Sequence, residues 1–218
     1  MTVPVIAVID YGIGNLHSAQ KSVEVCGADA RLTDDPDLIA SADGVVLPGV
    51  GAFGACMAAL RSAGLERPTL DAVASGRPFL GICVGMQMLF TGSEEDPDVA
   101  GLDVIPGTVR WIEPGDGPAA VKVPQMQWNR LDVVRDANGA IDPMLVGLDD
   151  DAWLYFVHSL HGVPDDPSVV VGTVEYGATI NAAFRLGNVF AAQFHPEKSS
   201  RDGLALLTHF VDICREAT

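Results

Sequence analysis

Basic residues are scarce in this sequence. Its 218 residues include 13 Lys and Arg but 29 Asp and Glu, which gives a formal net charge of −16. Nucleic acids and anionic membrane surfaces bind proteins through positive charge, so we expect neither of them as a partner. A small neutral substrate is a better match to this composition.

Long hydrophobic runs and linkers are missing as well. No stretch reaches the roughly 20 apolar residues that a membrane-spanning helix needs, and the N-terminus shows no basic leader followed by a cleavage site. We therefore predict a cytoplasmic protein. There is no Ser/Gly-rich or proline-rich linker and no internal repeat, and 48% of the residues are hydrophobic. We expect a single globular domain over residues 1–218.

Closely spaced cysteines are absent. The four cysteines lie far apart and form no CxxC pair: Cys26, Cys56, Cys83 and Cys214. This spacing disfavours a zinc site and a redox dithiol. His158 and His161 are a weak metal-ligand pattern, because no third ligand is obvious near them. We predict no metal and no cofactor.

The first half of the chain alternates strand and helix patterns. Apolar runs typical of strands buried on both faces each lead into a glycine-containing loop and then a helical pattern. The predicted strands are 3–9, 44–47 and 79–82, and the predicted helices are 16–26, 54–63 and 86–90. This alternation indicates a mostly parallel sheet with helices on both faces. Chemistry in such sheets collects at the carboxyl ends of the strands.

From about residue 108 the pattern changes to short strand-like runs. They lie at 121–123, 131–134, 153–157, 169–174 and 189–194. We expect more antiparallel pairing in this half. Ser199 or Ser200 can cap a last helix, in which Leu206 and Phe210 recur on one apolar face.

Cys83 stands in the strongest local motif. Residues 81–87 read GICVGMQ, with glycines two positions before and after the cysteine. This is the strand-to-helix elbow that presents nucleophilic side chains in hydrolases. A helix starting after Cys83 would direct backbone amides toward the sulfur and favour the thiolate. The other three cysteines fall among apolar residues of predicted helices, and we expect inert core thiols there.

A base and an orienting carboxylate follow in residues 193–197, QFHPE. Alternate residues of an extended segment point to the same side, so Glu197 can lie behind the His195 ring. Cys83, His195 and Glu197 then form a nucleophile, a general base and a carboxylate that fixes the imidazole.

The predicted chemistry also needs donors for an oxyanion and contacts for the substrate. The Val84 amide is one candidate donor, and the loop of Gly49, Val50 and Gly51 is another. Gln87, one turn after the nucleophile, can bond a polar substrate group. Glu94 can hold a substrate ammonium, although it is equally compatible with a solvated loop charge.

Taken together, residues 81–87 and 193–197 resemble the class I glutamine amidotransferases. Further segments resemble, more narrowly, the glutaminase subunits of imidazole glycerol phosphate synthase: 10–16 (DYGIGNL), 48–53 (PGVGAF), 123–129 (VPQMQWN) and 155–159 (YFVHS). The resemblance covers essentially the whole chain. It implies a three-layer, flavodoxin-like α/β fold with an additional antiparallel β region, and hydrolysis of L-glutamine to glutamate and ammonia.

The resemblance also implies a partner. In that family the glutaminase forms a heterodimer with a (β/α)8 cyclase subunit, which uses the ammonia to make imidazole glycerol phosphate and an aminoimidazole carboxamide ribotide. The segment expected near the interface contains Gln125, Gln127, Trp128 and Asn129, with Lys198 as a further interface charge. Gln127 departs from the family pattern, which has glycine there, and a long polar side chain at this position could alter docking or gating.

Other functions stay open at this point. The chain could serve another class I acceptor enzyme, as in anthranilate or pyridoxal phosphate synthesis, although the Asp-Tyr-Gly opening argues against both. A binding or regulatory protein of the same fold would not need the intact triad. A cysteine peptidase would need an open cleft for a polypeptide.

Overall fold

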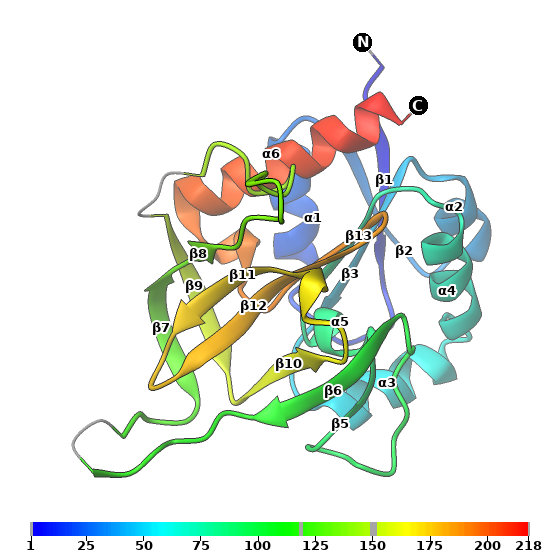
Figure 1. Ribbon diagram of the computed structural model, residues 1–218. Helices are drawn as coiled ribbons and strands as arrows, with labels where there is room; N and C mark the ends of the chain where they lie inside the picture. Colours follow the sequence, from blue (N-terminus) through cyan, green and yellow to red (C-terminus); the bar gives the residue numbers. More distant parts are fainter. Residues whose placement is uncertain (1, 118–119, 149–151, 218) are drawn as a thin grey trace.

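The structure is a computed structural model that describes residues 2–117, 120–148 and 152–217 (Figure 1). The helices in this part are α1 (Leu16–Val25), α2 (Pro36–Ser41), α3 (Phe53–Ser62), α4 (Glu66–Ala74), α5 (Val84–Gln87) and α6 (Ser200–Glu216), with 3₁₀ turns η2 (Pro167–Val169) and η3 (Pro196–Lys198). The strands are β1 (Val5–Ile9), β2 (Asp29–Thr33), β3 (Gly44–Gly49), β4 (Phe79–Cys83), β5 (Phe90–Ser93), β6 (Ile105–Trp111), β7 (Gln125–Arg130), β8 (Asp132–Val133), β9 (Trp153–His158), β10 (Leu160–Pro164), β11 (Val170–Glu175), β12 (Thr179–Leu186) and β13 (Val189–Ala192).

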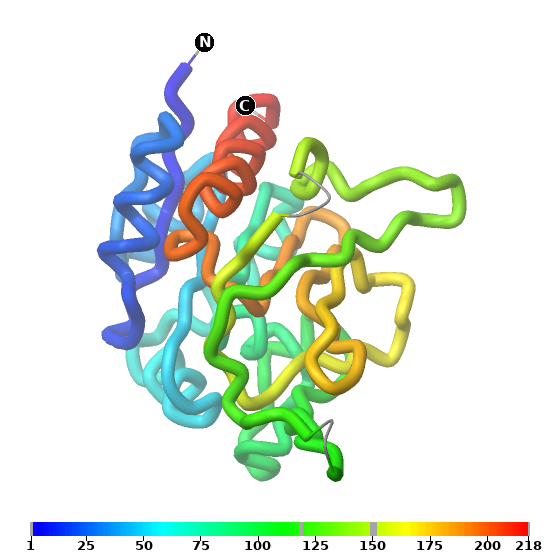
Figure 2. The backbone as a smooth tube through the Cα atoms, turned by 90° about the vertical axis from the view of Figure 1, so that its left-hand side faces the viewer, coloured from blue at the N-terminus to red at the C-terminus, as the bar shows by residue number. Residues whose placement is uncertain are grey.

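The main sheet confirms the predicted α/β architecture. Its strand order is β2-β1-β3-β4-β13-β12-β11-β8, and the strands from β2 to β13 in this order are parallel. Beyond β13 the pairing becomes antiparallel. Helices α1 and α6 lie side by side on one face, and α2 and α4 lie together on the other (Figures 1 and 2). The result is three layers.

The central strands are buried because their residues are apolar on both faces. Every residue of β3 and β4 is buried, including Val46, Leu47 and Leu80. In a parallel sheet covered by helices, such continuous apolar runs gain hydrophobic free energy from both sides. Gly49 at the end of β3 pairs with Cys83 at the end of β4, so the two strands end at the same edge of the sheet.

Smaller sheets form the additional β region. One has the order β10-β6-β5, and β7 pairs with β9 in an antiparallel ribbon. The pairing of β10 with β6 is antiparallel, whereas β5 runs parallel to β6. These strands lie beside the carboxyl edge of the main sheet (Figure 1).

Two predicted elements are wrong. The helix expected over 86–90 is the single turn α5, after which the chain turns and enters β5. Both structures would bury Leu89 and Phe90, so the apolar run alone cannot separate them. The strand expected over 121–123 does not form. Pro124 has no N–H to give to a ladder, and β7 starts only after it.

The C-terminal helix α6 begins where the sequence predicts, but Ser199 does not cap it with its side chain. The Ser199 hydroxyl instead donates to the His195 carbonyl oxygen at 2.6 Å and accepts from the Tyr155 amide at 2.9 Å. It therefore ties β9 to the turn that carries His195. In the described residues no helix has the length and apolar character that crossing a membrane requires.

Candidate active site

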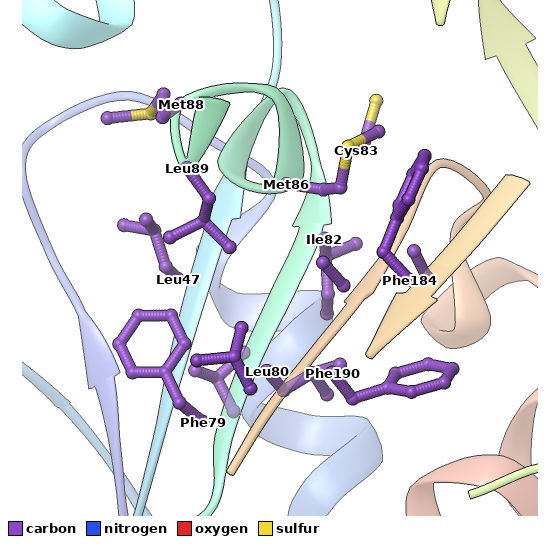
Figure 3. Packing of buried hydrophobic residues seen from close by; sticks show 14 of the residues in the cluster. Leu47, Phe79, Leu80, Ile82, Cys83, Met86, Met88, Leu89, Phe184 and Phe190 are labelled. Atoms are coloured by element: carbon purple, nitrogen blue, oxygen red, sulfur yellow. The ribbon is translucent and has the colours of Figure 1, made fainter. Parts of the chain in front are cut away.

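Cys83 occupies the sharp turn between β4 and α5. Its backbone has φ 55° and ψ −115°, a left-handed conformation that costs a non-glycine residue about 1–3 kcal/mol. The turn is so tight that a Cβ on Gly85 would lie 1.9 Å from the Leu47 carbonyl oxygen. Figure 3 shows Cys83 at the end of β4, above the packed side chains of Leu80 and Ile82. The elbow therefore presents the sulfur at the edge of the core.

His195 and Glu197 follow β13, the strand beside β4. The His195 Nδ1 lies 2.7 Å from a Glu197 carboxylate oxygen, and both side chains are 3% exposed. Burial alone would lower the pKa of the imidazole. Hydrogen bonds and charges from Cys83 and Glu197 outweigh burial and raise the pKa of His195 to about 9. The ring is thus held as an imidazolium between the sulfur and the carboxylate at neutral pH.

A buried pair of amides adds a contact that the sequence reasoning missed. The Gln193 Nε2 lies 3.8 Å from the Cys83 sulfur, and Gln87 Nε2 donates to Gln193 Oε1 at 3.0 Å. Gln193 is fully buried. A signal was present, because Gln193 opens the motif of residues 193–197 and stands directly after β13, two residues before His195.

The sulfur and the imidazole open into a cavity of about 350 Å³. This cavity collects most of the residues that the sequence assigned to the substrate and the oxyanion. Its walls are formed by Val50, Gly51, Cys83, Val84, Gln87, Glu95, Pro124, Val157, His158, Ser159, Leu160, His195 and Lys198. The size and the convergent polar groups are typical of a small-molecule site.

Gly49 lies behind this wall and packs against α5. A Cβ at Gly49 would lie 2.5 Å from the Gly85 nitrogen. Glycine is therefore needed for the loop of β3 to approach the elbow this closely. The approach brings Val50, Gly51 and Val84 to one side of the cavity, next to Cys83.

Glu94 lies outside the cavity wall, and Glu95 takes the place expected for it. Glu94 accepts a hydrogen bond from the Trp111 amide at 3.1 Å, and its carboxylate lies 3.9 Å from Arg110. Glu95 accepts from the Phe53 amide at 2.7 Å and faces the cavity. The two carboxylates are neighbours in the turn after β5, so an error of one position exchanges them.

The wall opposite Cys83 is built by the second half of the chain. His158 is buried, with Nδ1 2.8 Å from the Leu160 carbonyl oxygen and Nε2 2.9 Å from Gln125 Oε1. Burial lowers the pKa of His158 to about 4, so the ring is neutral. Residues 2–117, 120–148 and 152–217 contain no group of three or more His, Cys, Asp or Glu side chains arranged to hold a metal ion.

The sequence profile of the class I glutamine amidotransferases matches residues 7–213. The chain belongs to this family. Among curated relatives, this amidotransferase is 51% identical over 211 residues to the imidazole glycerol phosphate synthase subunit HisH of Syntrophotalea carbinolica, covering 95% of this chain and 100% of that one. It is 47% identical to the subunit of the same name from Methanothermobacter thermautotrophicus, covering 96% and 99%. It is therefore a HisH-type glutamine amidotransferase.

Solved structures agree with the fold of this amidotransferase. The structure of PurLQS from Thermotoga maritima superposes with a TM-score of 0.72 at 20% identity, covering 97% of this chain and 99% of that one. A further crystal structure described as a glutamine amidotransferase gives a TM-score of 0.71 at 17% identity, covering 96% and 98%. These likenesses concern the fold alone.

The residues that the sequence assigned to an interface do not share one environment in the amidotransferase. Gln125 is fully buried, where its Oε1 meets His158, so it cannot contact a partner directly. Gln127 and Trp128 are exposed on β7. Asn129 is half-buried and donates to the Glu175 carbonyl oxygen at 3.0 Å. Lys198 lies in the cavity wall.

Proposed function

We propose that Cys83, His195 and Glu197 hydrolyse L-glutamine to glutamate and ammonia. The observation that carries this proposal is the contact of a strained elbow cysteine with an imidazole that is itself held by a buried carboxylate. The match to the amidotransferase family supports glutamine as the substrate. Residues 1–218 would act as a single amidotransferase domain without a cofactor.

In the first step, the Cys83 thiolate attacks the carboxamide carbon of glutamine. The carbonyl electrons move to oxygen and form a tetrahedral oxyanion. When this intermediate collapses, His195 gives its proton to the departing nitrogen, ammonia leaves, and a γ-glutamyl thioester remains on Cys83. Water then attacks the thioester while His195 accepts a proton, which releases glutamate and restores Cys83.

The oxyanion requires N–H donors placed before the reaction. The Val84 amide and the amides of Val50 and Gly51 are the candidates, because these residues flank Cys83 in the cavity. One such donor typically stabilises the transition state by about 3–4 kcal/mol. Gln87 is a candidate contact for a polar group of glutamine. For the substrate ammonium we now propose Glu95 in place of Glu94, since Glu95 lies in the cavity wall.

We further propose that the ammonia passes to a (β/α)8 cyclase subunit in a heterodimer. The two relatives reported above are named as subunits of imidazole glycerol phosphate synthase, which supports such a partner. The products of the partner would be imidazole glycerol phosphate and an aminoimidazole carboxamide ribotide. A protected path has a physical reason, because ammonia in neutral water is protonated and loses its nucleophilic lone pair. A cytoplasmic location for this reaction stays a prediction.

The outer face of the β7–β9 ribbon is our candidate for the docking surface. Met126 and Trp128 are 62% and 42% exposed there, and Trp128 packs edge-on against Tyr155. Met126 pairs with Val157, which also lines the cavity. Exposed aromatic and Met side chains are enriched at interfaces. A partner seated on this face would cover the cavity from the side of Val157.

The test is glutamate release from glutamine by the purified protein, alone and with a cyclase subunit and its ribotide ligand. We expect weak release alone and strong stimulation by the liganded cyclase. Release that the cyclase does not change would keep the triad chemistry but contradict this partner and favour another acceptor enzyme. No release under either condition would contradict the glutaminase itself. Cleavage of peptides in preference to free glutamine would favour a peptidase.

A further inference from the structure

Beneath the loop Pro48–Gly51 lies a buried pair that the triad mechanism does not use, Tyr11 and Cys56. Tyr11 follows β1 and is 4% exposed, and Cys56 lies in α3 and is fully buried. Neither residue lines the cavity. Both carry a proton donor that is aimed at the backbone of the loop.

The two side chains hold alternate carbonyl groups of the loop. The Tyr11 hydroxyl donates to the Pro48 carbonyl oxygen at 2.7 Å, and the Cys56 thiol donates to the Val50 carbonyl oxygen at 3.2 Å. Burial raises the pKa of Tyr11 and the pKa of Cys56. Both groups therefore keep their protons and remain donors at neutral pH.

Holding a carbonyl also fixes the N–H of the next residue. A peptide unit is planar and trans, so its C=O and N–H point in opposite directions. With the Val50 carbonyl directed at Cys56, the Gly51 N–H must point away from α3. Gly51 lies in the cavity wall beside Cys83. The bond from Tyr11 to Pro48 fixes the Gly49 peptide in the same way.

Close packing leaves the loop little room to turn without displacing Tyr11. A Cβ on Gly49 would lie 2.9 Å from the Tyr11 hydroxyl oxygen. The same hydroxyl lies 3.8 Å from the sulfur of Met88, which follows α5. The phenol thus joins the loop after β3 to the segment after the nucleophile.

We propose that Tyr11 and Cys56 are positioning residues for the loop Pro48–Gly51: Cys56 sets the direction of the Gly51 N–H, a candidate oxyanion donor, and Tyr11 anchors the Pro48–Gly49 peptide from which the loop leaves β3. This inference rests on the proposed glutaminase function and adds residues that act through the backbone, without touching the substrate. It also gives Cys56 a role in place of the inert core thiol that the sequence predicts.

The variants that test it are Tyr11→Phe and Cys56→Ala, each of which removes one donor. Loss of an oxyanion donor costs about 10²–10³ in kcat, so a donor whose direction is loosened should cost about tenfold or more. We expect this fall in kcat, with the KM for glutamine changed by less than about twofold. Cys56→Ser keeps a donor and should recover most of the activity that Cys56→Ala loses. All variants are assayed as the complex with the liganded cyclase.

Matched controls separate this effect from a general loss of packing. Tyr176→Phe removes a hydroxyl that donates to the Lys122 carbonyl oxygen at 2.6 Å, and Cys214→Ala removes a buried thiol from α6. Both should leave kcat unchanged. Equal losses of kcat in the controls and in the loop variants would overturn the proposal, because the effect would then be one of stability.

The rate at which iodoacetamide alkylates Cys83 separates the proposed role from a merely structural one, because a general structural defect would slow this alkylation as well. In this reaction the thiolate displaces iodide at a saturated carbon and no oxyanion forms. We expect Tyr11→Phe and Cys56→Ala to alkylate Cys83 at the wild-type rate while their glutaminase kcat falls. A parallel fall in both rates would place the damage in the triad and contradict the proposal. Unchanged kcat in both folded variants would also contradict it.

Hydrogen exchange of the Gly49 and Gly51 amides distinguishes a failure here from a failure of the proposed function. Faster exchange in Tyr11→Phe and Cys56→Ala than in the controls is expected, whatever reaction the site performs. If the wild-type protein did not turn over glutamine, the proposed function would be wrong. The exchange rates would still decide whether Tyr11 and Cys56 hold the loop. Exchange rates equal to wild type would overturn the holding role itself.

Discussion

The parallel part of the main sheet and the small sheets beside it contribute different things to one cavity. Strands β3, β4 and β13 end at the same edge and carry the loop Pro48–Gly51, Cys83 and His195, to which we assign the oxyanion donors, the nucleophile and the base. The small sheets supply the opposite wall through Val157, His158 and Leu160, and they leave aromatic side chains exposed. In our proposal the parallel part thus concentrates the chemistry, and the small sheets shape the pocket and offer a surface to a partner.

Removal of the nucleophile should have the largest effect and should affect only the chemistry. Cys83→Ala is expected to reduce glutamine turnover to background, because no other described thiol lies in the cavity wall. Binding of the cyclase and synthesis from added ammonia should persist, since binding uses the proposed β7–β9 face and the synthesis takes place on the partner. Glutamate release and ammonia-dependent cyclase activity measure the two functions separately. Remaining glutamine turnover would remove Cys83 from its assigned role.

Loss of the orienting carboxylate should have the next largest effect. Glu197→Gln is expected to lower kcat by about 10²- to 10⁴-fold, the usual contribution of a positioned acid or base. Since the pKa of His195 is raised to about 9, wild-type activity should fall as the imidazolium deprotonates above about pH 9. Without the Glu197 charge this pKa falls, so the alkaline limb should move to lower pH by about 1 unit or more.

The pH profile of kcat in wild type and Glu197→Gln measures this shift. An alkaline limb at the same pH in both proteins would show that Glu197 does not set the proton affinity of His195.

The raised pKa of His195 also makes the stability of the folded protein depend on pH. A raised pKa in the folded protein stabilises it fully below the unfolded value of about 6.5, and this contribution is lost as pH rises through about 9.

The parallel part is also the region that the sequence predicts well. Strands β1, β3 and β4 are continuous apolar runs that end in glycine loops, and the family motifs stand at their ends. The structure confirms these strands. Strand β2 was missed because Asp29 and Arg31 interrupt its apolar pattern, and they form an exposed ion pair instead.

The small sheets were harder to predict because tertiary contacts decide their side-chain environments. Gln125 reads as a polar surface residue, but pairing of β7 with β9 buries it beside His158. Glu94 and Glu95 cannot be distinguished without knowing which of them faces the cavity. The role proposed for Tyr11 has no sequence signal of its own, since it depends on the approach of β3 to the end of β1.

A substitution on the ribbon should affect the partner and spare the chemistry. Trp128→Ala is expected to weaken binding of the cyclase by about 2 kcal/mol, or about 30-fold in Kd, as for an aromatic residue central to an interface. Glutamine turnover without the cyclase should not change. Titration of the cyclase by calorimetry measures the loss, with Trp111→Ala as an exposed control outside β7 and β9. Unchanged affinity in Trp128→Ala would exclude this face from the interface.

The smallest effect is expected away from the cavity, on stability alone. Arg185 donates to both carboxylate oxygens of Asp142 at 2.7 and 2.8 Å, and the Asp142 side chain is only 4% exposed. Asp142→Ala leaves Arg185 without these charged acceptors, so the free energy of unfolding should fall by about 1.5–3 kcal/mol. Urea unfolding measures this change. The kcat for glutamine should stay at its wild-type value, and a matching fall in kcat would show that the two regions are coupled.

The most direct test is to locate the covalent intermediate. Acid quenching during steady-state turnover of glutamine, followed by peptide mass spectrometry, should find one γ-glutamyl group on Cys83 and none on Cys26, Cys56 or Cys214. The amount of this adduct should be higher in the cyclase complex than in the isolated protein, and higher in the wild type than in Glu197→Gln. A γ-glutamyl group on a different residue, or turnover with no adduct on Cys83 when deacylation is slow enough to trap one, would contradict the account.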